Sequence, residues 1–439
     1  MESFFYFCCM YYSVDIDGSS IKKIKNFLVH YARRFDLSII LDSNSHIFPQ
    51  RDHLHKTYDL IAGFGNRQDI SGTILTYEKL AEIDPSSDNW YLGYITYDLK
   101  NRIESLHSKN PAYLNWPEVL FFEPSILLLI TFNRLEIHIN SGAITPRNIL
   151  DELNSFSIDI RPMVPIRLKP RTSKDDYMTG AVKIMDHIRR GDIYELNYCQ
   201  EFYNHLAIDP YYTYLSMNEH SPSPFSAFMK INNLFLLSVS PERFLKKIQS
   251  KLISQPIKGT SSREKIKKAD VRSRNYLQTS LKERTENIMI TDLVRNDLSK
   301  IALKKTVHVD ELCGIYAFPH VYQMISSVSA TIKHVTFAEI IKATFPMGSM
   351  TGAPKISAMK LIDRYENVSR GLYSGTVGYI APGMDFDLNV VIRSLQYDEE
   401  TNYMSYMTGS ALTALSDPEK EYEECLLKSY AINQSIAYA

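Results

Sequence analysis

The stretch FSAFMKINNLFLLSVSPERFLKKIQSKLISQPIKGT, residues 225–260, decides the expected fold. It holds three runs with strand-like apolar content, FSAFMKI, FLLSVSPERFL and KLISQPIKGT. Before it, Ser173 is the predicted N-cap of a helix that carries Asp175 and Asp176 in its first turn and ends at Gly191. Strands and helices in this mixed order predict an α+β fold.

A Pro-bearing connection at 161–173 separates two regions of the chain, 1–165 and 166–439. The apolar start of the first region lacks a basic segment and a cleavage site, so we predict a first strand there rather than a signal peptide. Further strands are expected at 38–44, 58–65, 90–99, 135–140, 373–381, 387–397 and 402–412. Further helices are expected at 275–297 and 417–436, and two more are expected to begin near Thr336 and after the loop 345–355.

The composition is that of a globular protein, with 44% hydrophobic and 23% charged residues. Lys and Arg number 49 and Asp and Glu number 50, a balance that argues against a nucleic-acid or membrane partner. The longest apolar stretch, from Val119, is broken by Glu123 and Pro124 and is too short to span a membrane. Five cysteines without CxxC spacing favour a reducing compartment, so we expect a cytoplasmic protein.

Two acidic pairs stand at helical spacing, Glu283 with Glu286 and Glu421 with Glu424. Residues three apart share one helix face, where like charges repel unless a cation lies opposite. A solvated acidic face explains any single pair. Two such pairs favour a shared hard cation, because carboxylate oxygens and water are the ligands that Mg²⁺ prefers.

Three more charged residues are candidates for chemistry. In a cleft, desolvation or nearby cations would lower the pKa of Lys258, just before Gly259, and make its amine nucleophilic. The alternative is a surface lysine on a strand edge. Glu242 could equally form a salt bridge with Arg243. Arg393 could lie on a strand edge or clamp a carboxylate from the wall of a cleft.

Eight motifs occur in the order typical of the chorismate-utilising enzymes, and the chain resembles that family from about residue 170 to 435. They are GDIYELNYCQ (191–200), SVSPERF (238–244), PIKGT (256–260), ERTENIMITDLVRNDL (283–298), FPMGSMTGAPK (345–355), YSGTVGYI (373–380), VIRSL (391–395) and DPEKEYEECLLK (417–428). The resemblance implies a four-layer αββα sandwich with two orthogonally packed, mainly antiparallel sheets, whose core residues 1–165 share.

Within this family, PIKGT resembles the aminodeoxychorismate synthases, which supply p-aminobenzoate for folate synthesis. In anthranilate synthases alanine replaces the lysine, and isochorismate and salicylate synthases usually have LAG there. The resemblance therefore implies the large component of an aminodeoxychorismate synthase. The alternatives are an anthranilate or isochorismate-type synthase and a non-catalytic chorismate-binding subunit. The presence of Lys258, Glu242 and all four glutamates argues against the last of these.

The resemblance also implies a magnesium-dependent reaction on chorismate. Mg²⁺ would hold the ring carboxylate of the substrate, with Glu286 and Glu424 as direct ligands and Glu283 and Glu421 holding its water molecules. No cysteine of the sequence lies in a GxCxG-type nucleophile loop. We therefore expect a separate glutamine amidotransferase subunit to supply ammonia.

In the implied mechanism, Lys258 attacks C2 of chorismate and Glu242 protonates the departing C4 hydroxyl. Ammonia then attacks C4 and expels the lysine. The resemblance assigns the remaining substrate contacts to Thr260, Gly259, Ser349, Tyr373, Arg393, Gly409, Gln323 and Lys428.

Two positions depart from the family pattern. Gln323 stands where many members have the histidine of an HLVS motif, and His320 lies three residues earlier. Glutamine can orient a hydroxyl group but cannot transfer protons at neutral pH. Ala411 also stands where a second glycine is common, so a slightly looser backbone approach is expected there.

Overall fold

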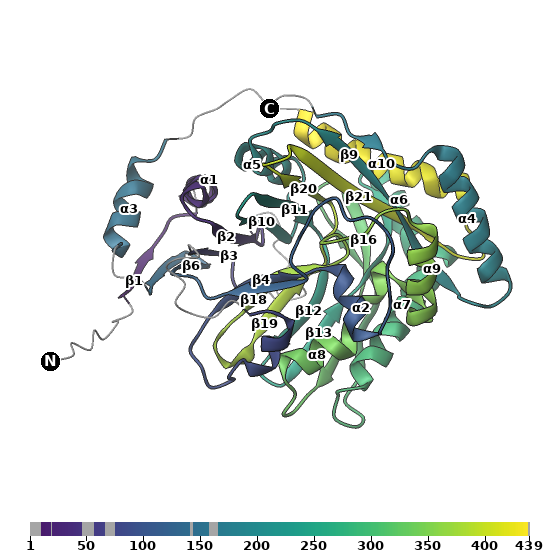
Figure 1. The fold of residues 1–439 in the computed structure, drawn as a ribbon, viewed down its shortest axis with the longest axis horizontal. Coiled ribbons are helices and arrows are strands. Elements are labelled where there is room, and N and C mark those ends of the chain that lie inside the picture. The colour runs from purple at the N-terminus through teal and green to yellow at the C-terminus, as the bar shows by residue number, and fades with distance from the viewer. Residues whose placement is uncertain are drawn as a thin grey trace.

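The computed structural model describes residues 10–18, 20–45, 57–65, 75–140, 144–157 and 166–437. Two large sheets form its centre, and every strand pairing among the described residues is antiparallel (Figure 1). The predicted α+β class and two-sheet architecture are therefore confirmed.

The first sheet has twelve strands and combines segments from both halves of the chain. In spatial order it contains β1 (Met10–Asp15), β7 (Arg134–Ile139), β6 (Ile126–Thr131), β3 (Leu60–Gly65), β2 (Leu37–Asp42), β10 (Phe225–Ile231), β11 (Leu234–Ser240), β20 (Ser394–Asp398), β21 (Tyr403–Leu412), β9 (Glu195–His205) and β17 (Gly352–Ala353), with β8 (Lys169–Pro170) also paired to β9. β1 begins at the end of the apolar start of the chain, and residues 1–9, where most of the expected first strand falls, lie outside the described residues.

The second sheet has nine strands. In spatial order it contains β14 (Ile257–Ser262), β16 (Val321–Thr331), β13 (Lys251–Gln255), β12 (Arg243–Ile248), β19 (Phe386–Asn389), β18 (Thr376–Ile380), β4 (Tyr91–Ile95) and β5 (Val119–Phe122), with β15 (His308–Ala317) also paired to β16. Both sheets thus draw strands from either side of residue 165, and the proposed division of the chain there stays a prediction.

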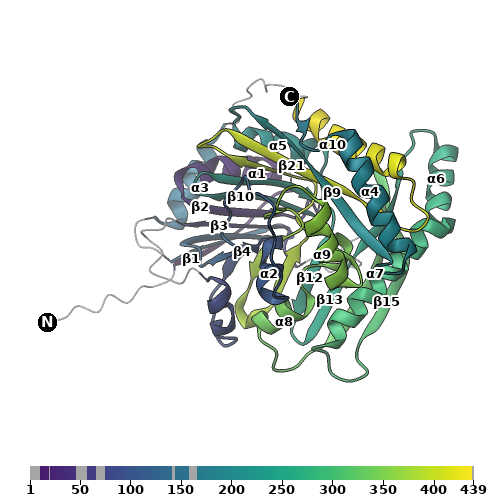
Figure 2. The same cartoon turned by 45° about the vertical axis from the view of Figure 1, so that its right-hand side comes forward.

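Ten helices are found in the described residues, and they cover the outer faces of the sheets (Figures 1 and 2). They are α1 (Ser20–Tyr31), α2 (Lys100–Ile103), α3 (Pro146–Ser155), α4 (Lys174–Arg189), α5 (Pro210–His220), α6 (Lys267–Thr279), α7 (Leu281–Ser299), α8 (Phe337–Thr344), α9 (Lys355–Tyr365) and α10 (Pro418–Ala437). Among the described helices, none combines the length and apolar character needed to cross a membrane.

Separate apolar clusters define the layers. Ile39 of β2 and Tyr94 of β4 belong to the cluster between the two sheets, whose strands cross at a large angle (Figure 2). On the outer face of the first sheet, Phe27 of α1 packs in the cluster that contains strand residues of β3 and β6. On the outer face of the second sheet, Ile290 of α7 and Phe337 of α8 pack in a cluster that contains strand residues of that sheet. The four layers αββα follow from these contacts.

The sequence signals for several helices are confirmed. Ser173 caps α4, because its hydroxyl oxygen accepts a hydrogen bond from the backbone N–H of Asp176. Gly191 follows the helix with a positive φ of 83°, the conformation that glycine adopts most easily. Thr336 caps α8 in the same way.

The helix expected at 275–297 is in fact two helices. The backbone of Ser280 is extended, which ends α6, and its hydroxyl oxygen accepts a hydrogen bond from the backbone N–H of Glu283 to cap α7. Serine competes with helical hydrogen bonding in this way and therefore favours caps. The break places Lys282 and Glu283 in the first turn of α7.

The strand expected at 387–397 is also interrupted. β19 ends at Asn389 in the second sheet and β20 begins at Ser394 in the first, so the chain crosses between the sheets. Arg393 lies in this crossing with a positive φ of 50°. The run at 90–99 is likewise shorter than expected, because β4 stops at Ile95 and a 3₁₀ turn follows.

A buried ion pair between Arg370 and Glu366 connects β9 to the loop before β17, because it makes hydrogen bonds to both. The Arg370 Nη2 lies 2.6 Å from the Glu366 Oε1, and both side chains are almost fully buried. The guanidinium also donates to the backbone oxygens of Met350 and Asn197, at 2.6 and 2.8 Å. Glu366 accepts a hydrogen bond from the backbone N–H of Cys199. The pair therefore fixes two segments that both contribute side chains to the site described below.

We predict that Arg370→Met lowers the free energy of unfolding by about 3–5 kcal/mol, because it leaves the Glu366 carboxylate buried without its partner. Urea denaturation followed by circular dichroism measures this change. Arg364→Met, an exposed arginine of the neighbouring helix, is the matched control and should change stability by less than about 0.5 kcal/mol. Equal stability of the two variants would contradict the prediction.

Candidate active site

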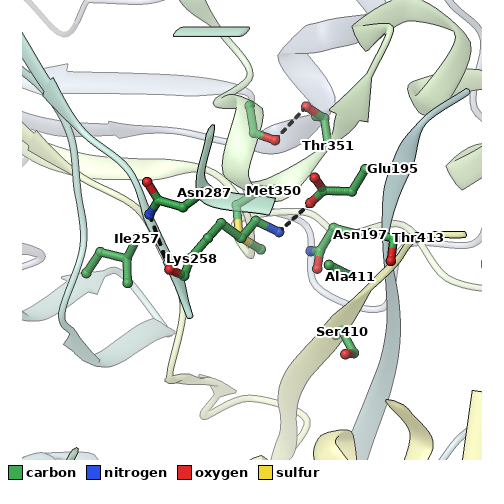
Figure 3. Close-up of polar contacts among 12 residues, drawn as sticks. Glu195, Asn197, Ile257, Lys258, Asn287, Met350, Thr351, Ser410, Ala411 and Thr413 are labelled. Atoms are coloured by element: carbon green, nitrogen blue, oxygen red, sulfur yellow. Dashed lines mark hydrogen bonds and ion pairs between the residues drawn. The ribbon is translucent and has the colours of Figure 1, made fainter. Parts of the chain in front are cut away.

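Lys258 extends from β14 of the second sheet to β9 of the first (Figure 3). Its Nζ lies 2.7 Å from the Glu195 Oε1, and the two side chains are 11% and 1% exposed. Asn287 of α7 donates a hydrogen bond to the backbone oxygen of Lys258 at 3.2 Å. Gly259 follows with a φ of 95°, which lets the strand turn beside α7. Although β14 is at a sheet edge, the amine of Lys258 is therefore not at the surface.

The charges around Lys258 differ from the expectation. Burial alone lowers the pKa of this amine, but the carboxylates of Glu195, Glu286 and Glu242 outweigh burial and raise the pKa to about 12. The predicted lowering is wrong because carboxylates, and not cations, surround the amine. In this state Lys258 is an ammonium ion, so it must lose a proton before it can act as a nucleophile.

Glu242 is buried between β11 and β12. Burial raises its pKa to about 7, while hydrogen bonds from Ser349 and from the backbone N–H of Ile257 limit the rise. The suggested salt bridge with Arg243 is wrong, because that guanidinium pairs with Asp387 at 2.7 Å. A carboxyl group with this pKa can donate a proton near neutral pH.

The first acidic pair is buried on α7. Glu286 is 7% exposed, and its Oε1 has no hydrogen-bond partner. Burial raises the pKa of Glu286 to about 7, with Lys258 and Lys282 opposing the rise. Burial also raises the pKa of Glu283, and a Cβ atom at Gly259 would lie 3.1 Å from its Oε2. Glycine at that position thus leaves room for the carboxylate.

Lysines hold the second acidic pair on α10. The Lys282 Nζ lies 3.0 Å from the Glu421 Oε1, and Ser410 of β21 donates its hydroxyl to the other oxygen of that carboxylate. The Lys428 Nζ lies 2.7 Å from the Glu424 Oε1. Burial acts to raise the pKa of Glu424, but Lys428 outweighs burial and the pKa is lowered.

The four glutamates face one another without closing into a cage. Glu283 interacts electrostatically with Glu424 and Glu421 across the gap between α7 and α10. Within the described ranges, however, no three His, Cys, Asp or Glu side chains converge as a metal ion requires. The unpartnered, buried Glu286 Oε1 and the all-carboxylate donor set fit Mg²⁺ chemically. The residues thus suit that ion, while lysines neutralise the outer pair.

Arg393 lies near Glu242 and Tyr406, with which it interacts electrostatically. Burial lowers the pKa of its guanidinium. Among the described residues, no ion pair to this guanidinium is found, so it is available to an anionic ligand. Tyr373, in contrast, is buried, and its hydroxyl oxygen accepts from the Cys199 Sγ at 3.8 Å.

Gln323 and Thr260 are paired across β16 and β14. The Thr260 hydroxyl donates to the Gln323 Oε1 at 3.4 Å, and the Gln323 Nε2 is buried without a partner. His320 does not replace the missing histidine, because it is exposed and contacts the backbone oxygen of His220.

Gly409 of β21 accepts a hydrogen bond at its backbone oxygen from Lys428, at 2.8 Å. A Cβ atom at Gly409 would lie 2.8 Å from the backbone oxygen of Tyr198, so the close approach of β21 and β9 requires glycine. Ala411 pairs with Asn197 farther along the same two strands.

Sequence reasoning missed three residues of this site, Glu195, Lys282 and Asn287. Glu195 begins β9, a strand that also carries Glu201 and several amide side chains, so its local pattern did not mark it. Lys282 directly precedes Glu283, and its role depends on α10, which lies far along the chain. Nothing in the local pattern distinguishes Asn287 from a solvated helix residue.

Comparisons with known proteins identify the family of this chain. Residues 39–434 match the family described as chorismate binding enzyme. "Aminodeoxychorismate synthase, chloroplastic" of Arabidopsis thaliana is 32% identical over 392 residues, which cover 83% of this chain and 42% of that protein. The chain therefore spans less than half the length of this plant relative. "Anthranilate synthase component 1" of Thermus thermophilus is 30% identical, with 79% of this chain and 77% of that protein covered.

Two solved structures share the fold at low sequence identity. The isochorismate synthase MenF of Escherichia coli has a TM-score of 0.75 at 14% identity, covering 98% of this chain and 95% of that one. Anthranilate synthase component I of Streptococcus pneumoniae has a TM-score of 0.71 at 19% identity, covering 99% and 93%. With the family match over most of its length, the chain belongs to the chorismate binding enzymes.

Proposed function

We propose that this chain is the chorismate-binding component of an aminodeoxychorismate synthase, which converts chorismate and ammonia to 4-amino-4-deoxychorismate and water. The observation that carries the proposal is the buried amine of Lys258, set among carboxylates beside Glu242. A lysine at this position resembles the aminodeoxychorismate synthases rather than the anthranilate synthases. Relatives of both kinds lie near 30% identity, so overall similarity does not decide between them.

The first half of the reaction forms a covalent adduct. After Lys258 gives a proton to the neighbouring Glu195 carboxylate, its nitrogen forms a bond to C2 of chorismate and the double bonds of the ring shift. The bond from C4 to its hydroxyl oxygen breaks, and Glu242 donates the proton that lets this group leave as water. The pKa of about 7 keeps a large fraction of Glu242 protonated for this step near neutral pH.

The second half releases the lysine. Ammonia forms a bond to C4, the double bonds shift back, and the bond from C2 to Lys258 breaks. The amine recovers its proton from the incoming ammonia through the surrounding carboxylates, of which Glu195 is the nearest to it. The sum is chorismate plus ammonia giving the amino product plus water.

Binding of the substrate uses the unpaired groups of the site. We assign one chorismate carboxylate to Arg393, whose guanidinium has no ion-pair partner among the described residues, with the free Gln323 Nε2 as a second donor. We assign the other carboxylate to Mg²⁺ held by the four glutamates, where the ion would act as a Lewis acid and template. Glu286 and Glu424 are the proposed direct ligands, and Glu283 and Glu421 would hold the ion's water molecules.

We predict that Lys258→Ala abolishes the covalent adduct and most of the turnover while the fold is kept. Incubation with chorismate and Mg²⁺, followed by acid quench and peptide mass spectrometry, detects the adduct on Lys258 in the wild-type protein. Lys246→Ala, another buried lysine of the second sheet, is the control and should retain the adduct. Substrate-derived mass on another residue, with Lys258 unmodified, would overturn the assignment.

We predict that Glu195→Gln shifts adduct formation to lower pH by about 1–3 units, the usual effect of one opposite charge in contact. The Glu195 carboxylate stabilises the ammonium form of Lys258 and so raises its pKa. Removing that charge lowers the pKa, and a larger fraction of free amine is present at each pH. The measurement is the adduct rate against pH without ammonia. Glu201→Gln on the same strand, which faces Arg171, should leave the profile unshifted.

We predict that the purified chain uses ammonium salts but not glutamine, and that an added glutaminase component confers glutamine use. Relatives from Bacillus subtilis and Thermus thermophilus are named as component 1 of their synthases, which supports a second component here. Since free NH₃ is the nucleophile, the ammonium-driven rate should rise with pH. Mass identification of the product separates aminodeoxychorismate from anthranilate. Sustained product from glutamine alone would show that this sequence contains a glutaminase site.

A further inference from the structure

We propose that Lys282 is a built-in counter-cation of the acidic pocket, which neutralises Glu421 when no divalent cation is bound and competes with that cation for the pocket. This inference rests on one part of the proposed function, namely that the four glutamates form a divalent-cation site. It assigns a role to a residue that takes no part in the proposed chemistry at Lys258.

The ion pair between Lys282 and Glu421 bridges two helices that carry the two acidic pairs. Lys282 lies in the first turn of α7, and Glu421 lies in the first turn of α10. Their charged atoms are 3.0 Å apart. Ser410 of β21 donates its hydroxyl to the second oxygen of Glu421. Both oxygens of a carboxylate that is 3% exposed are therefore already occupied.

Lys282 also lies within electrostatic range of the other acidic residues. Its ammonium interacts with Glu286 and Glu283 on its own helix, and it interacts with Glu424 across the gap. A cation at this point is close to the place where a shared metal ion would have to lie. Lys282 thus holds one of the four carboxylates that a shared metal ion would need.

The second lysine of the pocket is held differently. The Lys428 ammonium is anchored to the backbone oxygen of Gly409 as well as to Glu424, on its own helix. The Lys282 ammonium has Glu421 as its one hydrogen-bond partner among the described residues. Its side chain is 38% exposed and that of Lys428 is 41% exposed, so the number of hydrogen-bond partners, and not exposure, distinguishes the two lysines. Lys282 can therefore move toward solvent when a divalent cation takes over the carboxylate, and Lys428 can stay in place.

This arrangement has two measurable consequences. Without metal, Lys282 removes the cost of holding a buried, unpaired carboxylate, so it stabilises the metal-free protein. With metal, the same charge repels the incoming ion and must be displaced, so it weakens binding. Removing Lys282 should therefore reduce stability without metal and increase affinity for metal. If Lys282 served only to join two helices, its removal would change the stability of the metal-free protein and leave the affinity for metal unchanged.

The test is calorimetric titration of the full chain with Mn²⁺ alone, which replaces Mg²⁺ and needs no substrate. We expect Lys282→Met to bind Mn²⁺ about tenfold more tightly than the wild type, because one opposing charge is lost from a partly buried site. Lys282→Arg keeps the charge and should stay within about twofold. Lys174→Met, which removes an exposed 2.6 Å pair with Glu419 of the same helix α10, is the matched control and should also stay unchanged.

Thermal unfolding with and without Mn²⁺ provides a second readout. Lys282→Met should unfold at a lower temperature than the wild type in chelator and gain more from added Mn²⁺. If that variant does not fold in chelator, Lys282→Gln, prepared with Mn²⁺ present, serves for the same titration. Equal or weaker Mn²⁺ binding by Lys282→Met or Lys282→Gln, with clear binding by the wild type, would show that Lys282 does not compete with the cation, while the cation site itself would remain supported. If neither the wild type nor any variant binds Mn²⁺, both the competition by Lys282 and the cation site itself are overturned.

Discussion

The contact between Lys258 and Glu195 joins the two sheets, and the chemistry of the site depends on it. Taking these two charges out of water is costly, so the pair persists only because the backbone around it is held firmly. Asn287 fixes the backbone of Lys258 from α7. The buried pair of Arg370 and Glu366 fixes β9, which carries Glu195. The amine is therefore positioned from both sheets at once.

The site has an excess of buried carboxylates over buried cations, and this imbalance explains its properties. Burial raises the pKa of Glu242 and of Glu286 to about 7, while the same carboxylates raise the pKa of Lys258 to about 12. A site with this charge distribution suits a reaction that moves protons between an amine, an acid and a leaving hydroxyl group. It also suits a divalent cation, for which Lys282 is the substitute in the metal-free protein. Lys258 and Lys282 thus both interact electrostatically with the same carboxylates, Glu283 and Glu286.

Local sequence signals predicted the elements whose formation depends on neighbouring residues. The caps at Ser173 and Thr336 and the strand at 225–231 are found as expected, because capping and alternation are local effects. The run at 235–245 is divided between β11 in the first sheet and β12 in the second, and the run at 251–260 is divided between β13 and β14. Predictions failed where the chain changes sheet or direction. The run at 387–397 has strand-like apolar content on both sides of Arg393, so its local pattern could not show that it leaves one sheet at Asn389 and enters the other at Ser394.

Residue types and their spacing along the chain were enough to predict the α+β class and to single out Lys258, Glu242 and the four glutamates as candidates. What surrounds each of these residues became known only from the packing of the sheets and helices. It placed Glu195 against Lys258 and so reversed the expected direction of the lysine's pKa shift. It also placed Lys282 against Glu421. The physical reason is that electrostatic energies depend on distance and burial in space, and residues far apart in the sequence acquire both only when the sheets and helices pack.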